Sequence, residues 1–324
     1  MREPFCATKR NCASRRPVST LTASRVTDSQ SSPASPPART GVFLGVAAYT
    51  LWGLLPLYLR LLEHVPAAQI LAHRVLWSAF LLVVAALLFR RLPIIIAAVT
   101  RRTLLLLTAT ALLIGANWLV YIWAVQNGHV LDASLGYFIN PLVNVVLGVV
   151  VLGERVRRIQ GAAIALAAIG VAIMAVSNGG SIWISLELAL TFGFYGLLRK
   201  VAAIDALGGL LIETLLLAPF ALVLVLMTQA DGTGAFGHQG VSTDVLLIIV
   251  GALTAAPLLL FAAAARRMPY TALGLLQYIA PTLQFLLAIL VFGEHLRPHD
   301  LAAFALIWAG LAVYAVDVVR AART

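Results

Sequence analysis

The stretch DASLGYFINPLVNVVLGVVVLGERVRR, from Asp132 to Arg158, decides the fold of this chain of 324 residues. Its apolar run can cross a bilayer, which takes about 20 residues. Pro141 lacks a backbone donor and obstructs the carbonyl one turn back, which predicts a kink. Lipid tolerates such a break only where protein or a water-filled cavity satisfies the freed groups. A near copy, TALGLLQYIAPTLQFLLAILVFGEHLR, runs from Thr271 to Arg297 and predicts a second kink, at Pro281.

The composition predicts an integral membrane protein. The chain is 61% hydrophobic and 11% charged, whereas a soluble domain carries about 25% charged residues. The net charge of +10 does not indicate nucleic-acid binding, because seven of the 23 basic residues lie in the first 40 positions and most others flank apolar runs. Cys6 and Cys12 both lie in that N-terminal segment, so no disulfide framework, metal site or cofactor is expected.

Residues 1–40 are rich in Ser, Pro, Thr and Arg and have no apolar core of a secretory signal. We interpret them as a disordered cytoplasmic tail. An organellar transit peptide and a start codon placed too far upstream are the alternatives.

Ten apolar segments follow the tail and predict ten membrane-spanning helices. They cover approximately 42–62, 69–89, 103–126, 132–152, 159–177, 181–199, 209–228, 244–265, 270–292 and 300–319. Short connections make neighbouring spans antiparallel.

Basic residues then orient the chain with both termini in the cytoplasm of a multi-pass protein of the inner or plasma membrane. Only Arg60 and Arg297 fall on the outer side. The inner connections and the C-terminal tail hold Arg90, Arg91, Arg101, Arg102, Arg155, Arg157, Arg158, Arg199, Lys200, Arg266, Arg267, Arg320 and Arg323.

The two opening stretches belong to a longer internal repeat. Residues 135–174 align without gaps on 275–314, with 14 identical positions among 40. The offset of 140 residues spans five helices, and because five is odd the second half is inverted relative to the first. This is the plan of many secondary transporters, whose substrate site lies near the midplane between the halves. We therefore expect one repeat over 41–178 and another over 179–324.

Several blocks resemble the RarD family of EamA-type transporters, in the drug/metabolite transporter superfamily. They are LAHRVLWS (71–78), IGANWLVYIWAVQN (114–127), SLGYFINPLVN (134–144), LGERVRR (152–158), FYGLLRK (194–200), LIETLLLAP (211–219) and QYIAPTLQFLLA (277–288). The resemblance implies ten helices in two inverted five-helix EamA repeats and a permease that exports small metabolites or drugs. Glu187 departs from the small or apolar residue expected at its position.

Charged residues within apolar spans are candidate functional groups, because a charge at the bilayer centre is costly. Arg74 could bind a substrate carboxylate or phosphate, or extend to the outer interface. His73, Glu187 and Glu213 are proton-coupling candidates. A packing role for His73 and an interfacial role for Glu213 beside the loop with Arg199 are the alternatives.

Polar and aromatic residues on the two broken helices and on the third span predict a central binding cavity. Tyr137, Asn140 and Asn144 recur at three and four residues and share a helix face. The full set of substrate-binding candidates is Arg74, Asn117, Tyr121, Tyr137, Asn140, Asn144, Gln277, Tyr278 and Gln284. The alternative is hydrogen bonding between helices, which contributes about 0.6 kcal/mol per contact.

The remaining acidic motifs are interpreted as structural. Gly153-Glu154 and Gly293-Glu294 would end helices, with the glycine left-handed. Asp132 and Asp300 would be helix N-caps.

The sequence therefore predicts a secondary transporter that works by alternating access on a small molecule, embedded in lipid and without nucleic acid, and it leaves a homodimer open. The rival is a membrane-embedded enzyme acting on a lipid or isoprenoid. No catalytic residue is assigned, because the acids and histidines do not cluster in the sequence.

Overall fold

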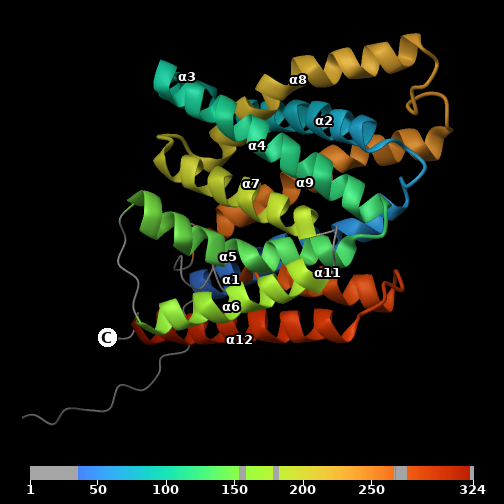
Figure 1. Cartoon of the computed structure of the whole chain (residues 1–324). Coiled ribbons are helices and arrows are strands. Elements are labelled where there is room, and N and C mark those ends of the chain that lie inside the picture. Colours follow the sequence, from blue (N-terminus) through green and yellow to red (C-terminus); the bar gives the residue numbers. More distant parts are fainter. Residues whose placement is uncertain (1–35, 153–157, 178–181, 266, 268–275, 322–324) are drawn as a thin grey trace, which may run out of the picture. The chain divides into compact units, whose positions relative to one another are not determined.

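The computed structural model describes residues 36–152, 158–177, 182–265, 267 and 276–321, and all the regular structure in those ranges is helical. Figure 1 shows the arrangement of the helices. The helices are α1 (Pro36–Arg60), α2 (Ala67–Leu88), α3 (Leu92–Ala98), α4 (Arg101–Gln126), α5 (Val130–Leu152), α6 (Arg158–Ser177), α7 (Ile182–Val201), α8 (Ala206–Ala230), α9 (Val241–Ala265), α11 (Ile279–Leu290) and α12 (Pro298–Ala321).

Among the described residues, seven helical segments are long and apolar enough to cross a membrane. They are Thr40–Arg60, Ala67–Leu88, Arg101–Gln126, Val130–Val151, Ile182–Val201, Ala206–Ala230 and Val241–Phe261. Three shorter apolar helical stretches are Gly161–Ile173, Ile279–Leu290 and Pro298–Val313. Each of the ten ranges expected from the sequence overlaps a helix, but the count of ten spans stays a prediction.

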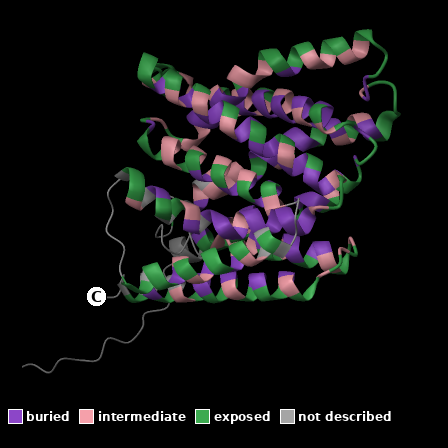
Figure 2. Cartoon of the chain, in the orientation of Figure 1, coloured by how far each residue is buried: buried purple, intermediate pink, exposed green. Residues whose placement is uncertain are grey.

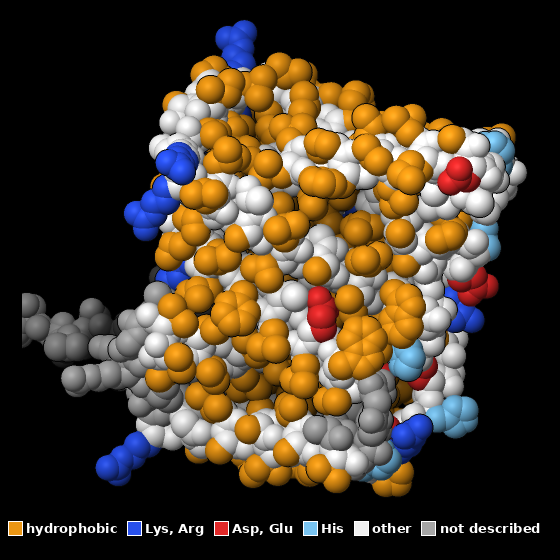
Figure 3. Space-filling model, turned by 45° about the horizontal axis from the view of Figure 1, so that its top comes forward, with side chains coloured by type: hydrophobic (Ala, Val, Ile, Leu, Met, Phe, Trp, Pro, Cys, Tyr) orange, Lys and Arg blue, Asp and Glu red, His pale blue; other side chains and the backbone are white. Residues whose placement is uncertain are grey.

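The surface of the protein supports the membrane assignment. Large apolar side chains are widely exposed, for example Phe43 at 72%, Phe220 at 74% and Leu290 at 75%. Figure 3 shows a broad hydrophobic face, with most of its visible Lys and Arg side chains along one edge and the His side chains along the opposite edge. A water-soluble protein rarely exposes such a continuous apolar area, so lipid is the solvent that this face requires.

Local chemistry explains several helix ends. The Thr100 hydroxyl accepts a hydrogen bond from the Thr103 amide at 3.1 Å where α4 begins, and the Asp205 carboxylate accepts one from the Gly208 amide at 3.0 Å where α8 begins. Gly293 has a φ of +68° after α11, as the helix-ending role of the Gly-Glu pair requires.

Asp132 and Asp300 are not N-caps, in contrast to the expectation. Each is the third residue of its helix, α5 or α12. The Asp300 carboxylate instead reaches back and accepts from the Arg297 amide at 3.0 Å, the arrangement that a third-position acid makes in a capping box.

The two prolines with expected kinks lie at different places in their helices. Pro281 lies in the first turn of α11, where its missing N–H removes no hydrogen bond of that helix. Pro141 lies in the middle of α5, but its side chain is outside the described residues. Further interior prolines are Pro56 in α1, Pro219 in α8 and Pro257 in α9.

Helices whose residues are 140 positions apart make corresponding contacts. At this offset α1 matches α7, α2 matches α8, α4 matches α9, α5 matches α11 and α6 matches α12. Accordingly α5 packs against α7 and α11 against α1, while α4 packs against α7 and α9 against α1. The matched helices α2 and α8, α5 and α11, and α6 and α12 also pack against each other. Figure 1 shows α6 and α12 side by side.

The contact between α6 and α12 is reciprocal at the level of single residues. A Cβ on Gly170 would lie 2.8 Å from the Ala303 carbonyl oxygen, and a Cβ on Gly310 would lie 2.7 Å from the Ala163 carbonyl oxygen. Gly170 and Gly310 are 140 residues apart, as are Ala163 and Ala303. The contact of Gly170 with Ala303 is thus repeated by their counterparts Gly310 and Ala163, with the two helices exchanged. Such a reciprocal pair of contacts is the signature of a two-fold axis between antiparallel helices.

A methyl group at Gly170 is expected to destabilise the protein. Gly170→Ala should lower the free energy of unfolding by about 1–3 kcal/mol, because backbone must move to admit the Cβ. Gly161→Ala on the same helix is the matched control, since a Cβ there meets no atom within 4 Å and alanine is the better helix former. Thermal unfolding of both variants in detergent measures the difference. Equal midpoints would contradict the close packing of α6 on α12.

Candidate functional site

A buried arginine organises the best-supported part of the expected site. Arg74, on α2, is only 4% exposed, and its guanidinium carbon lies 4.3 Å from the ring centroid of Trp118 on α4. Tyr121 and Tyr137 are near enough for their hydroxyls to interact electrostatically with the guanidinium. Figure 2 shows α2, α4 and α5 rich in buried residues. We call Arg74, Asn117, Trp118, Tyr121 and Tyr137 the Arg74 cluster.

Hydrogen bonds and ring contacts hold the cluster between three helices. The Tyr137 hydroxyl donates to Asn117 Oδ1 at 3.2 Å, and the rings of Tyr121 and Tyr137 meet edge to face at 5.7 Å. Asn117 Nδ2 donates to the Leu188 carbonyl at 3.1 Å and to the Thr191 hydroxyl at 2.9 Å. Asn117 therefore joins α4 to both α5 and α7.

Several polar atoms in this region have no hydrogen-bond partner among the described residues. They include Nε and Nη1 of Arg74, the hydroxyl oxygen of Tyr121, Oδ1 of Asn140 and Oε2 of Glu187. Arg74, Tyr121 and Asn140 are themselves buried. A buried polar atom without a partner is costly, so water or a ligand is expected to complete such a group.

The other binding candidates do not all join the cluster. Asn144 is exposed, whereas Asn140 on the same expected face is 5% exposed. Gln284 is buried on α11 and donates to the Trp52 carbonyl of α1 at 3.2 Å, while its Oε1 has no partner in the described part of the chain. Gln277 and Tyr278 are half-buried and precede the first turn of α11 rather than lying within the helix.

The proton-coupling candidates lie in three different environments. His73 is 5% exposed, and its ring stacks on Phe236 at 5.1 Å, in keeping with the packing alternative. Glu187 is half-buried on α7. Glu213 is fully buried on α8, and Arg199 of α7 lies beside it, with 3.7 Å between Arg199 Nε and Glu213 Oε1.

Glu213 is also the centre of a hydrogen-bonded network. Its Oε1 accepts from the Thr110 hydroxyl at 2.6 Å and its Oε2 from the Tyr195 hydroxyl at 3.3 Å. Arg199 Nη2 donates in turn to the Asp205 carbonyl at 3.1 Å, and Arg91 Nη2 lies 2.6 Å from Asp205 Oδ2. The network ties α4, α7 and α8 to the end of α2.

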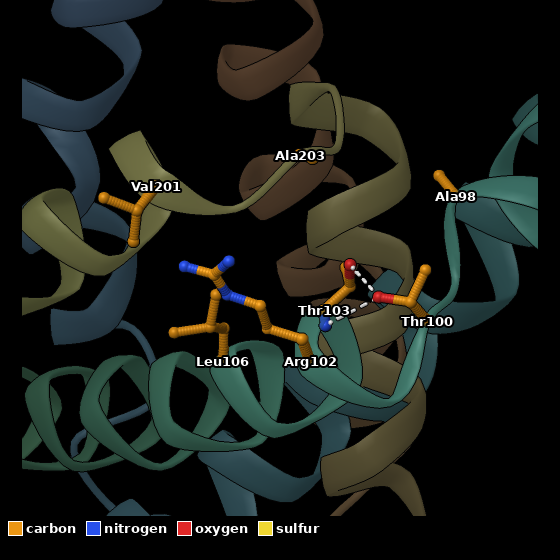
Figure 4. A pocket seen from close by; sticks show the side chains of 7 residues that line it. All are labelled: Ala98, Thr100, Arg102, Thr103, Leu106, Val201 and Ala203. Atoms are coloured by element: carbon orange, nitrogen blue, oxygen red, sulfur yellow. Dashed lines mark hydrogen bonds between the residues drawn. The ribbon is translucent and has the colours of Figure 1, made fainter.

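Two pockets lie near opposite ends of α4. One, of about 300 Å³, is lined by Ala98, Thr100, Arg102, Thr103, Leu106, Val201 and Ala203. Figure 4 shows the Arg102 side chain extending between α4 and the end of α7. The other, of about 360 Å³, is lined by Gly128, His129, Leu131, Asp132, Glu294, His295, Arg297 and Asp300. A helix of 26 residues separates them by about 39 Å.

The second pocket reveals a role for Glu294 that the sequence did not suggest. Its two carboxylate oxygens accept from the backbone amides of Val130 at 2.7 Å and Leu131 at 2.8 Å, so it caps α5. Burial raises the pKa of Glu294, outweighing the opposing effect of the two amides. The recurrence of Gly-Glu in both repeats was the sequence signal that could have suggested this role. Glu154, the counterpart of Glu294 in the first repeat, lies outside the described residues.

The described residues hold no group of three or more His, Cys, Asp or Glu side chains that could bind a metal ion. The pocket at Glu294 contains two histidines and three acids, but its charges pair with each other and with backbone amides, as His129 Nδ1 does with Asp132 Oδ2 at 3.0 Å.

Apolar helices of spanning length, with buried polar groups between them, define a multi-pass membrane protein. Comparison with known proteins agrees. The model of the EamA-like transporter family matches residues 39–176. An uncharacterized transporter of Pseudomonas aeruginosa is 48% identical over 286 residues, covering 88% of this chain and 96% of that protein. Protein RarD of Escherichia coli is 45% identical, covering 88% and 97%.

The chain therefore belongs to the RarD family of EamA-type transporters. A further relative, the chloramphenicol-sensitive protein RarD of Pseudomonas aeruginosa, is 37% identical over 288 residues and covers 87% of this chain and 96% of its own. One crystal structure with 18% sequence identity has a TM-score of 0.55 and covers 85% of this chain and 97% of that one, which shows a shared fold.

Proposed function

We propose that the protein is a secondary transporter that moves a small metabolite or drug by alternating access. Its halves, residues 41–178 and 179–324, are inverted five-helix repeats, and the ten spans leave both termini in the cytoplasm of an inner or plasma membrane protein. The Arg74 cluster, Asn140, Gln277 and Gln284 line the substrate path between the halves.

One observation carries this proposal, the reciprocal packing of helices 140 residues apart. Gly170 meets Ala303 as Gly310 meets Ala163, and Gly53 meets Leu283 as Gly193 meets Val143, at 2.6–3.0 Å from an added Cβ. Each of these contacts joins one repeat to the other. Two halves related by a two-fold axis can exchange conformations, and this exchange opens a central site first to one side and then to the other.

A membrane-embedded enzyme is the rival function. It would need acids, histidines or metal ligands gathered at one membrane face. The pocket at Glu294 does gather two histidines and three acids, but the Glu294 carboxylate accepts from the Val130 and Leu131 amides and Asp132 pairs with His129. Elsewhere, Glu187 is half-buried on α7, and Glu213 pairs with Arg199 and accepts from two hydroxyls. This distribution supports transport rather than catalysis.

The test begins with an untargeted comparison of medium and cell metabolites, with and without the protein, and continues with flux of the solute found in proteoliposomes. Flux is expected in the native protein and should be lost in Asn140→Leu and in Gln277→Leu. Asn127→Leu is the control, because Asn127 is exposed at the end of α4. Chemical conversion of the solute without its movement would overturn the proposal, and full flux in both variants would overturn the assigned path.

A further inference from the structure

Arg74 is a buried cation for which the described protein provides no anion. Its side chain is 4% exposed, and no ion pair joins it to a described carboxylate. Its nearest characterised neighbours are the neutral side chains of Trp118, Tyr121 and Tyr137. A charge withdrawn from water and left uncompensated is strongly unfavourable, so a counter-charge is expected to come from outside the chain.

The contact with Trp118 does not meet this need. The guanidinium carbon lies 4.3 Å from the centroid of the indole ring, and a cation–π contact of this kind supplies no hydrogen-bond acceptor to the N–H groups. The unpartnered Nε and Nη1 are the observed consequence. An oxyanion approaching in the guanidinium plane would accept from one of these N–H groups, a charge-assisted hydrogen bond of the kind that arginine makes with a carboxylate.

We propose that the Arg74 cluster binds the carboxylate of a monoanionic substrate that has an aromatic or aliphatic body, an inference that rests on the proposed transport function. The Tyr121 hydroxyl, which has no hydrogen-bond partner among the described residues, is a second donor to the carboxylate. Asn117 is a positioning residue, since its amide is occupied by Tyr137, Leu188 and Thr191.

The charge and the surroundings of the cluster favour a carboxylate over a phosphate. Arg74 supplies one positive charge, and the cluster contains no second Lys or Arg. A phosphate dianion would therefore leave a net negative charge in a dry site. The rings of Trp118, Tyr121 and Tyr137 continue into Phe192, whose ring is 6.0 Å from that of Tyr137. This aromatic wall suits the apolar part of an organic acid.

The test is a thermal-shift titration of the purified protein in detergent. The probes are monocarboxylates from acetate to 3-phenylpropionate, each beside its neutral amide, together with inorganic phosphate. We expect a carboxylate with an apolar body to raise the unfolding midpoint and its amide not to do so. Arg74→Gln should weaken the response on the order of 10- to 100-fold, the range for a hydrogen bond to a charged group.

Matched variants keep the test decisive. Arg60→Gln removes an arginine whose side chain is 49% exposed and should leave the response intact. Should Arg74→Gln fail to fold, Arg74→Lys retains the charge without the planar fork and should still weaken the response, and Tyr121→Phe should weaken it further.

An equal response to carboxylates and amides, a response to phosphate alone, or an unchanged response in Arg74→Gln would overturn the inference. Flux of a neutral solute with no carboxylate response would sink this inference and leave the transport proposal standing.

Discussion

Replacing Arg199 by methionine is expected to lower the free energy of unfolding by about 3–5 kcal/mol, the cost of leaving one partner of a buried ion pair without the other. Glu213 is fully buried, and Arg199 is the cation beside it, with a side chain 15% exposed. The Thr110 and Tyr195 hydroxyls would remain as donors, but neither carries a charge. Thermal or denaturant unfolding of the purified variant measures the loss.

Two further variants separate the ion pair from a general effect of removing a basic residue. Lys200→Met changes the adjacent, exposed cation and should have little effect, because surface charges contribute at most about 1 kcal/mol. Arg199→Met combined with Glu213→Gln should recover much of the stability, since no charge is then left buried. If the double variant were no more stable than Arg199→Met alone, Glu213 would not be the reason for the loss.

The position of Arg199 depends on a small residue. A Cβ on Gly209 would lie 1.7 Å from Arg199 Nη1, so the glycine leaves the space that the guanidinium occupies. The sequence suggested that Glu213 lies near Arg199, and the two side chains are neighbours, but it did not indicate that Glu213 is fully buried. Sequence spacing places residues along a helix, whereas burial depends on what covers that helix. Here α4 packs against α8, and the Arg199 and Tyr195 side chains of α7 reach Glu213 itself.

Helix positions could be predicted from the sequence because long apolar runs in this chain alternate with short polar connections. The ninth range, 270–292, illustrates the limit. The described helix there is α11, which begins only at Ile279 and places Gln277 and Tyr278 before its first turn. An apolar run fixes where the chain meets lipid but does not fix where, within that run, the helical hydrogen bonds begin. Pro281 lies in the first turn of that helix, a place proline tolerates because its missing N–H has no partner there, and the kink stays a prediction.

Part of the site could also be predicted. Arg74, Asn117, Tyr121 and Tyr137 are brought together because each was a polar or charged residue in an apolar helix, and such residues face protein rather than lipid. Asn144 shows what the sequence pattern alone could not predict. It shares the expected face of α5 with Asn140, yet it is exposed, because a face is covered only as far as the neighbouring helix extends.

Contacts between distant segments were beyond sequence reasoning. Glu294 caps α5 across 164 residues of chain. Trp118 covers Arg74 although the two lie on different helices. A repeat in the sequence indicates that two segments are alike, but it does not say which residues of one half touch the other. The offset of 140 became informative about contacts only once the pairs Gly170–Ala303 and Gly310–Ala163 were placed in space.

Asn117→Leu is expected to reveal whether the polar residues of α4 and α5 stabilise the bundle or line a path through it. The substitution removes the acceptor of the Tyr137 hydroxyl and the donor to Thr191, and each buried group left without a partner costs about 1–3 kcal/mol. Tyr137→Phe removes only the hydroxyl at the other end of the same hydrogen bond. Stability of both single variants and of the double variant forms a double-mutant cycle, with Asn127→Leu as an exposed control on the same helix.

Coupling of about 1 kcal/mol between Asn117 and Tyr137 is expected if the bond at 3.2 Å is formed in a dry interior. Independent effects would mean that water satisfies both groups, so that the polar residues face a solvated path in the resting protein. The two outcomes assign different roles to Asn117. In a dry interior it holds Tyr137 and Thr191 in place beside Arg74, and its loss would weaken carboxylate binding through misplacement of the tyrosine. In a solvated path Asn117 would contact the substrate itself, and Asn117→Leu would impair transport without a matching loss of stability.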